Sequence, residues 1–249
     1  MSYGPQSVLH DRMSSKERLH AWLITIGCIA VVAITVVYLL FQARDEKALY
    51  EGYEVAVAPM TGQIEHSFDP LDTPVDIDAK PKMVVWPKKS WKRISLEDGR
   101  GSSITVMGQA TIQGRIYGVD LYHGPATRYI SPVDISMGWQ RAATDASFAS
   151  NSVHHGNRAA WSRTQKGWPH HQFSNSHLIP ASWEIYQVLK DAKPDDRIAI
   201  TGWPVTVRTL GIRPWISDLN IGDRNCEIML ITAVRIERAD GSLRGQAAL

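Results

Sequence analysis

Apolar residues run without a charge from Ala21 to Phe41, and this stretch organises the whole chain. A helix of these twenty-one residues, at about 1.5 Å of rise each, is about 30 Å long, the thickness of a bilayer's hydrocarbon core. A helix also satisfies every backbone polar group in lipid. Trp22 and Tyr38 lie near its ends, where amphipathic rings prefer the interface. The pattern predicts a transmembrane helix, since a buried core helix rarely runs so long without a polar face.

The same stretch distinguishes an anchor from a cleaved signal. A signal peptide has an apolar core of about 7–15 residues and a small-x-small cleavage site, whereas Phe41-Gln42-Ala43 begins with a large residue. We therefore expect an uncleaved anchor. Lys and Arg near the ends of a span set its orientation. Three precede it and two follow it (Arg12, Lys16 and Arg18; Arg44 and Lys47), which predicts an inside N-terminus and an exported C-terminal domain.

Composition divides the rest of the chain. Residues 1–20 are a polar cytoplasmic tail, and residues 42–99 are expected to form a juxtamembrane helix and a proline-rich linker. Prolines at four positions between residues 55 and 82 favour extended backbone there. Residues 100–238 have the pattern of a β-rich soluble domain, and residues 239–249 are a polar tail.

A basic run occupies residues 80–93, with six cations and two tryptophans (Lys80, Lys82, Lys88, Lys89, Lys92, Arg93, Trp86 and Trp91). Such a run suits anionic lipid headgroups or another polyanion, with indoles at the interface. Short charge runs more often form a solvated face. We favour that interpretation, with Val84, Val85 and Trp86 packing inward from a strand pair.

The soluble part predicts three strands, one helix and two strands. Alternation and turn residues place them, in order, at residues 103–107, 111–122, 127–139, 182–192, 197–207 and 226–236. Residues 140–176 are polar and irregular, and long loops of this kind are usually functional or mobile. A small OB-like barrel, with one helix between strands 3 and 4, has this order. An open α+β sheet has it too.

Charge and cysteine content limit the partners and the disulfides that we expect. The chain has 27 basic and 25 acidic residues, so its net charge gives no reason to expect nucleic acid as a partner. Cys28 lies in the predicted span and Cys226 in the soluble part, so the two cannot form a disulfide in one folded chain.

Three blocks resemble an uncharacterised family of bacterial proteins with a single N-terminal membrane anchor. They are Ser131-Pro132-Val133-Asp134 with Gly138-Trp139, then Asn175 to Ala181, and then Asn225-Cys226-Glu227. The resemblance covers residues 105–237. It implies a cellular location but no activity, because no activity is known for the family. It implies a bacterial inner membrane, with a cytoplasmic N-terminus and a periplasmic domain. Gln140 and Ile221-Gly222-Asp223 depart from the family pattern.

Four residues are candidates for chemistry. His177 lies between a polar loop and a helix start, and it would serve as a general base, with Asp134, Cys226 or Glu227 as partner in a hydrolase-like site. We favour structural roles for three of these residues. His177 would fix the loop, Cys226 would lie in the core, and Asp134 would cap a turn.

Tryptophans suggest a binding module. Trp139, Trp168 and Trp203, with Asn175 and His177, would line a site for a glycan or another ligand on loop 140–176. No spacing predicts a metal site or a cofactor. The sequence thus favours a membrane-tethered, non-enzymatic domain that binds a protein partner in an envelope complex. A hydrolase-like enzyme and a ligand-binding module are the alternatives.

Overall fold

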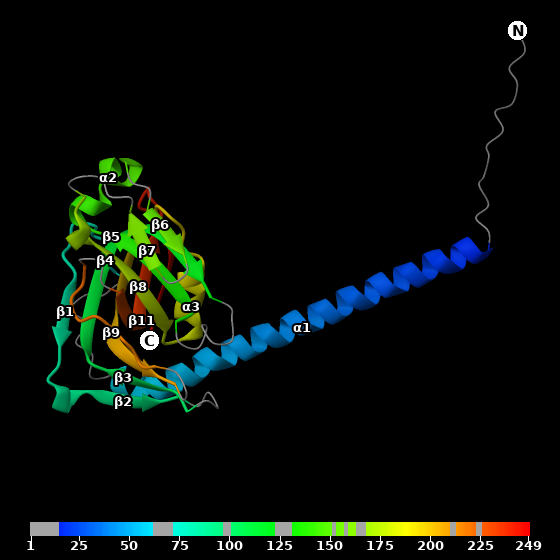
Figure 1. The fold of residues 1–249 in the computed structure, drawn as a ribbon, viewed down its shortest axis with the longest axis horizontal. Helices are drawn as coiled ribbons and strands as arrows, with labels where there is room; N and C mark the ends of the chain where they lie inside the picture. Colours follow the sequence, from blue (N-terminus) through cyan, green and yellow to red (C-terminus); the bar gives the residue numbers. More distant parts are fainter. Residues whose placement is uncertain are drawn as a thin grey trace, which may run out of the picture. The chain divides into compact units, whose positions relative to one another are not determined.

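The computed structural model describes residues 15–61, 72–96, 101–122, 131–150, 153–156, 159–162, 168–209, 213–222 and 226–249. The chain forms two compact units, residues 1–47 and 48–249. Helix α1 (Ser15–Thr61) runs across this boundary, so its residues 15–47 belong to the first unit and its residues 48–61 to the second. Figure 1 shows the order of the elements along the chain.

Helix α1 is long and apolar enough to cross a membrane, with a mean hydropathy of 2.7 over its most apolar stretch. Its large apolar side chains between Leu19 and Phe41 are exposed. Such a helix is consistent with a membrane anchor or a signal sequence. Residues 48–61 of the same helix belong to the second unit, where Tyr50, Val57 and Met60 are buried in the core of the β-rich domain.

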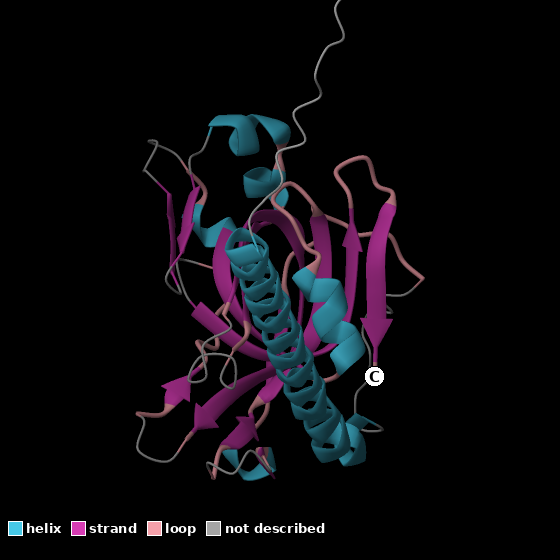
Figure 2. Ribbon diagram, turned by 90° about the vertical axis from the view of Figure 1, so that its right-hand side faces the viewer, coloured by secondary structure: helices cyan, strands magenta, loops and turns pink. Residues whose placement is uncertain are grey.

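Five strands of the second unit close into a mixed β-barrel. They are β4 (Gly108–Leu121), β5 (Val133–Gly138), β8 (Phe173–Pro180), β9 (Arg197–Arg208) and β11 (Cys226–Glu237). The order around the barrel is β4-β5-β8-β11-β9, and the pairing of β4 with β9 closes it. Only β8 and β11 pair in parallel among the described barrel strands. Figure 2 shows these strands curving around one core.

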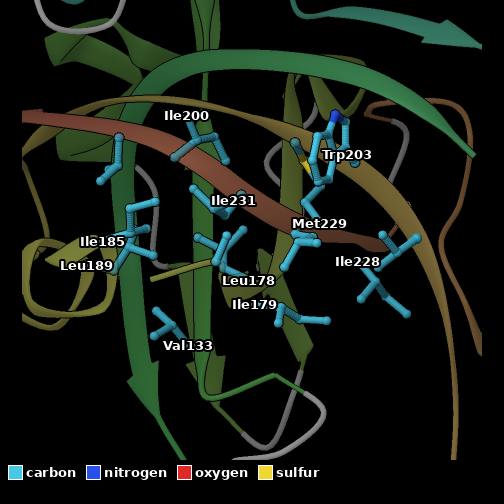
Figure 3. Close-up of a cluster of buried hydrophobic side chains, with 14 of the residues drawn as sticks. Val133, Leu178, Ile179, Ile185, Leu189, Ile200, Trp203, Ile228, Met229 and Ile231 are labelled. Atoms are coloured by element: carbon cyan, nitrogen blue, oxygen red, sulfur yellow. The ribbon is translucent and has the colours of Figure 1, made fainter. Parts of the chain in front are cut away.

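Helix α3 (Trp183–Lys190) lies in the chain between the third and fourth barrel strands. Ser182 caps it, because its Oγ accepts a bond from the backbone N–H of Ile185. The helix packs beside β11 and the C-terminal strand β12 (Leu243–Ala248) (Figure 2). Figure 3 shows side chains from α3, the parallel strands and β9 meeting in one apolar cluster, including Leu178, Ile185 and Ile231.

Further strands extend the sheet beyond the barrel. Strand β1 (Lys82–Val85) pairs with β4, whereas β2 (Lys92–Ser95) pairs with β3 (Ser103–Val106), and β3 pairs with β9. A 3-10 turn, η1 (Lys88–Ser90), joins β1 to β2. Strand β10 (Trp215–Ile216) pairs with β9.

The long segment between β5 and β8 has structure of its own. It contains η2 (Gln140–Ala143), α2 (Asp145–Ser150), the two-stranded sheet of β6 (Val153–Gly156) and β7 (Ala159–Ser162), and η3 (His170–Gln172). Residues 140–176 were expected to be irregular. The expectation was wrong for these elements, since a hairpin and three short helical segments lie there.

Three other expectations differ from the structure. Helix α1 reaches Thr61, although proline content predicted extended backbone from residue 55, because Val57 and Met60 bury their side chains in the domain. Residues 243–248 form β12 rather than a tail. Val84 and Val85 are 61% and 42% exposed, so they do not pack inward from the basic run, whereas Trp86 packs against the core as predicted.

Candidate functional site

The registers of β5, β8 and β11 sort the candidate residues onto two faces of the barrel wall. Asp134 lies opposite His177, and His177 lies opposite Ile228. One residue along, Ser176 lies opposite Glu227. Because neighbouring residues of a strand point to opposite faces, Asp134 and His177 share one face and Glu227 occupies the other. The hairpin β6–β7 and Trp215 contact the face of Asp134 and His177, so this face is the outside of the barrel.

The Asp134–His177 pair is the centre of a polar cluster on that outer face. The Nδ1 atom of His177 lies 2.5 Å from Oδ1 of Asp134. The Tyr122 hydroxyl donates to Oδ2 of Asp134 at 3.2 Å, and Oγ of Ser131 lies 3.5 Å from Oδ1. The ring of Trp215 covers the imidazole, with 4.4 Å between ring centroids. Both oxygens of the Asp134 carboxyl group therefore have a hydrogen-bond partner, as a buried polar group requires.

The cluster is closed to solvent. Asp134 is 0% exposed and His177 is 2% exposed. The hairpin contributes His155, whose Nδ1 lies 3.0 Å from Oγ of Ser136 and whose Nε2 lies 3.8 Å from Oδ2 of Asp120. Burial lowers the pKa of His155, and Asp120 opposes that shift. A general base needs a path to its substrate, and the described part of the chain gives this pair none.

Glu227 lies on the inner face, away from the Asp134–His177 pair. It is 0% exposed and bonds to the hydroxyl of Ser174, with Oγ of Ser176 at 3.5 Å. Burial raises the pKa of Glu227 to about 8, and the bond from Ser174 opposes this shift only in part. The side chain is therefore mostly a neutral acid at pH 7, a hydrogen-bonding element of the core.

Cys226 shares the outer face with Asn175, which lies opposite it in the register. Burial raises the pKa of the Cys226 thiol to about 11, with Glu227 contributing next, while the Asn175 side chain lowers it. A reactive cysteine needs the thiolate, so this thiol is a poor nucleophile. Its backbone bonds run to Asp218.

The predicted tryptophans do not share a surface. Trp203 is in the main core at 1% exposure, and Trp168 packs in a second small cluster with Phe173 and Ala142. Trp139 is also buried, at 3% exposure, and it borders an open hollow of about 470 Å³. The other lining residues come from residues 80–83, from the ends of loop 140–176 and from residues 219–221.

Sequence reasoning missed several members of the outer cluster: Tyr122, Ser131, Ser136, His155 and Trp215. One signal was available. Along β5 the sequence alternates Asp134 and Ser136 with Ile135 and Met137, and such alternation predicts a strand with a polar face. The cover from β6–β7 and β10 had no such signal, because it depends on contacts distant in the chain.

Among His, Cys, Asp and Glu side chains in the described ranges, no group of three is arranged to hold a metal ion. In comparisons with known proteins, no family model, no curated protein and no solved structure matches the chain.

Proposed function

We propose that the chain is a single-pass protein of a bacterial inner membrane, whose periplasmic β-rich domain is a non-enzymatic binding or assembly module. One observation carries this proposal: the folded unit starts at Ala48, seven residues after the apolar stretch ends at Phe41. A domain that begins so close to a span stays near the bilayer surface. A partner in the same membrane would meet it at a raised effective concentration.

The chemistry of the barrel wall supports binding over hydrolysis. The hydrolase-like alternative needs an accessible base and an activated nucleophile. His177 and Asp134 lie together but are sealed, and burial raises the pKa of Cys226 to about 11. Glu227 lies on the opposite face of the wall from His177.

The proposal extends to the barrel type, which we assign to the OB class. Three barrel strands, helix α3 and two barrel strands follow in chain order, and the third and last of them pair in parallel. In OB folds the face of strands 2 and 3 binds oligonucleotides or oligosaccharides. Here that face belongs to β5 and β8, and the hairpin β6–β7 covers it. Binding is therefore proposed at another surface, and nucleic acid is not the proposed partner.

Two measurements test this function. A reporter that is active only in the periplasm, fused after Leu249, should be active, whereas a reporter that works only in the cytoplasm should be silent. The reverse pattern contradicts the orientation. Full-length protein, cross-linked in membranes and then isolated, should carry a partner in a fixed ratio. Recovery of the chain alone contradicts an assembly role.

A ligand-binding module is the second candidate, because the hollow beside Trp139 lies where loop 140–176 begins and ends. The Gln172 amide donates to Oε1 of Gln140 at 3.1 Å, and both side chains line the hollow with Asn220. The indole of Trp139 is only 3% exposed, so the amide groups are what the hollow offers, and they suit the hydroxyls of a sugar. Titration with a four-sugar chito-oligosaccharide should show binding that Gln172→Ala weakens and Gln187→Ala, on α3, leaves unchanged. Equal binding by both variants, or none by the parent, excludes this candidate for that ligand class.

A further inference from the structure

The segment from β1 to β2 presents apolar side chains to solvent. Val84 is 61% exposed and Val85 is 42% exposed, although both belong to a strand that pairs with β4. Because Val84 and Val85 are neighbours on a strand, they point to opposite faces, so each adds a single apolar side chain near the exposed Pro87. We call residues 84–93 the basic tip.

Cations surround these side chains. Lys88, Lys89, Lys92 and Arg93 are all exposed, and no acidic residue lies between residues 80 and 93. In the described part of the chain, none of these four makes a salt bridge. Lys80 and Lys82 are left out of the basic tip, because they line a hollow of about 260 Å³ together with Asp76.

Two half-buried indoles shape the tip. The Nε1–H of Trp91 donates to the backbone oxygen of Trp86 at 2.9 Å, and Nζ of Lys88 lies 5.9 Å from the centroid of the Trp91 ring. The turn η1 is closed by a bond from the N–H of Ser90 to the oxygen of Pro87 at 2.7 Å. The cations therefore sit on an ordered turn, so little conformational freedom is lost when they meet a surface.

We propose that the basic tip docks on the anionic phospholipid headgroups of the bilayer in which the chain is anchored. Cations next to exposed apolar side chains and half-buried indoles match a membrane interface, where anionic headgroups lie above acyl chains. The inference rests on the proposed membrane anchor, which keeps the domain within reach of that surface. Docking fixes which face of the barrel remains open to a partner.

The test uses the full chain in vesicles, with Cys28→Ser, Cys226→Ser and Ser90→Cys, and a bimane label at residue 90. Vesicles of phosphatidylcholine alone are compared with vesicles holding 30% phosphatidylglycerol, each with the same small fraction of a lipid that carries a nitroxide on its headgroup. Quenching should be stronger with phosphatidylglycerol and should weaken at high salt. A label at Ser242→Cys should show no such difference.

Charge reversal gives the discriminating result. One basic residue near an anionic surface changes the equilibrium constant for surface contact by about fivefold. Lys88→Glu/Lys89→Glu should therefore reduce that constant by at least about 25-fold. Lys190→Glu/Lys193→Glu, an equal change in net charge on and after α3, should retain the contact. Val84→Ser/Val85→Ser should reduce it at constant charge. Equal quenching in both vesicle types, or equal loss in both charge reversals, overturns the proposal.

Carbonate extraction of the same vesicles separates the two proposals. A chain that stays in the membrane but shows no lipid-dependent quenching contradicts the docking tip alone. A chain that is extracted contradicts the anchor, whatever the quenching shows.

Discussion

The Nδ1 atom of His177 lies 2.5 Å from Oδ1 of Asp134, and the two side chains are 2% and 0% exposed. Breaking such a buried pair leaves one polar partner unsatisfied, which typically costs about 3–5 kcal/mol. We expect Asp134→Asn to lower the free energy of unfolding by about 3 kcal/mol. Denaturant unfolding of the full chain in detergent, followed by tryptophan fluorescence, measures this.

Asp145→Asn is the matched control for that change. Asp145 pairs with Arg115 at 2.6 Å, but its side chain is 97% exposed. Exposed ion pairs contribute about 0–1 kcal/mol, so the control should change stability by less than about 1 kcal/mol. Equal losses in the two variants would mean that the Asp134–His177 pair contributes no more than a surface contact.

Stability should fall as the pH rises through neutrality, because of Glu227. Burial raises its pKa from 4.5 in the unfolded chain to about 8 in the folded one. Between these values the folded state binds more protons than the unfolded state, so the free energy of unfolding falls with pH. The contribution is fully present below about pH 4.5 and is lost as the pH rises through about 8, at up to about 1.4 kcal/mol per pH unit.

Glu227→Gln should remove this slope and leave a protein more stable than the parent at pH 8, because the amide stays neutral. Unfolding at several pH values between 5 and 8 measures the slope. Glu184→Gln, at an exposed position in the first turn of α3, should keep it. A parent protein whose stability is flat across this range contradicts the assigned shift.

The sequence pattern correctly predicted the helices and strands whose formation depends on residues close to one another in the chain. Ser182 caps α3 as expected, and the predicted strands at 197–207 and 226–236 correspond to β9 and β11. Strand β8 was not predicted, because its Asn175 and His177 are polar residues of a central strand. His177 bonds to Asp134 on β5 and lies against Trp215 on β10, contacts that are distant in the sequence, and Asn175 lies opposite Cys226 of β11. The strand predicted at 103–107 is β3, which lies outside the closed barrel.

The candidate site was predictable only in part, for the same reason. His177 and Asp134 were named as possible partners from residue type, and their register brings them together. Cys226 and Glu227 are adjacent in sequence, yet a strand directs them to opposite faces, so only Cys226 shares the face of His177. Burial of the pair depends on Trp215 and His155, whose elements no local pattern connects to β5.

Cys226 should react slowly with alkylating reagents. Its pKa is raised from 9.0 to about 11, so its thiolate at pH 7 is about a hundredfold scarcer than in an unperturbed cysteine. In a Cys28→Ser background, the iodoacetamide rate should rise steadily with pH and level off only near 11. Asn175→Ala should slow it further, because the Asn175 side chain lowers this pKa. Fast labelling at pH 7 would contradict the raised pKa and would support a role for Cys226 as a nucleophile.

Two glycine-to-alanine changes should have opposite signs. A Cβ on Gly202, in barrel strand β9, would lie 2.2 Å from the backbone oxygen of Leu230, so the barrel wall must move. We expect Gly202→Ala to destabilise the domain by about 3 kcal/mol. Gly52, on the exposed side of α1, has no heavy atom within 4 Å of the added Cβ, so alanine should stabilise it by about 0.5–1 kcal/mol. Thermal melting of both variants compares them, and equal shifts would contradict the close approach.

The end of α1 should behave as part of the β-rich domain. Tyr50 is 1% exposed, and its ring stacks on Tyr186 with 4.6 Å between centroids and an interplanar angle of 19°. Removing a buried aromatic ring costs about 3–5 kcal/mol, so Tyr50→Ala should lower the free energy of unfolding by about that amount. Tyr50→Phe, which keeps the ring, should cost less than about 1 kcal/mol.

Tyr38→Ala makes the same change twelve residues earlier in α1, where the side chain is 60% exposed. It should leave unfolding of the domain unchanged, because Tyr38 belongs to the other compact unit. If Tyr50→Ala is equally silent, the stack on Tyr186 does not hold in solution and the folded domain starts later than Ala48. The seven-residue interval between the apolar stretch and the domain would then lengthen. Of these variants, Tyr50→Ala therefore tests the proposed tether most directly.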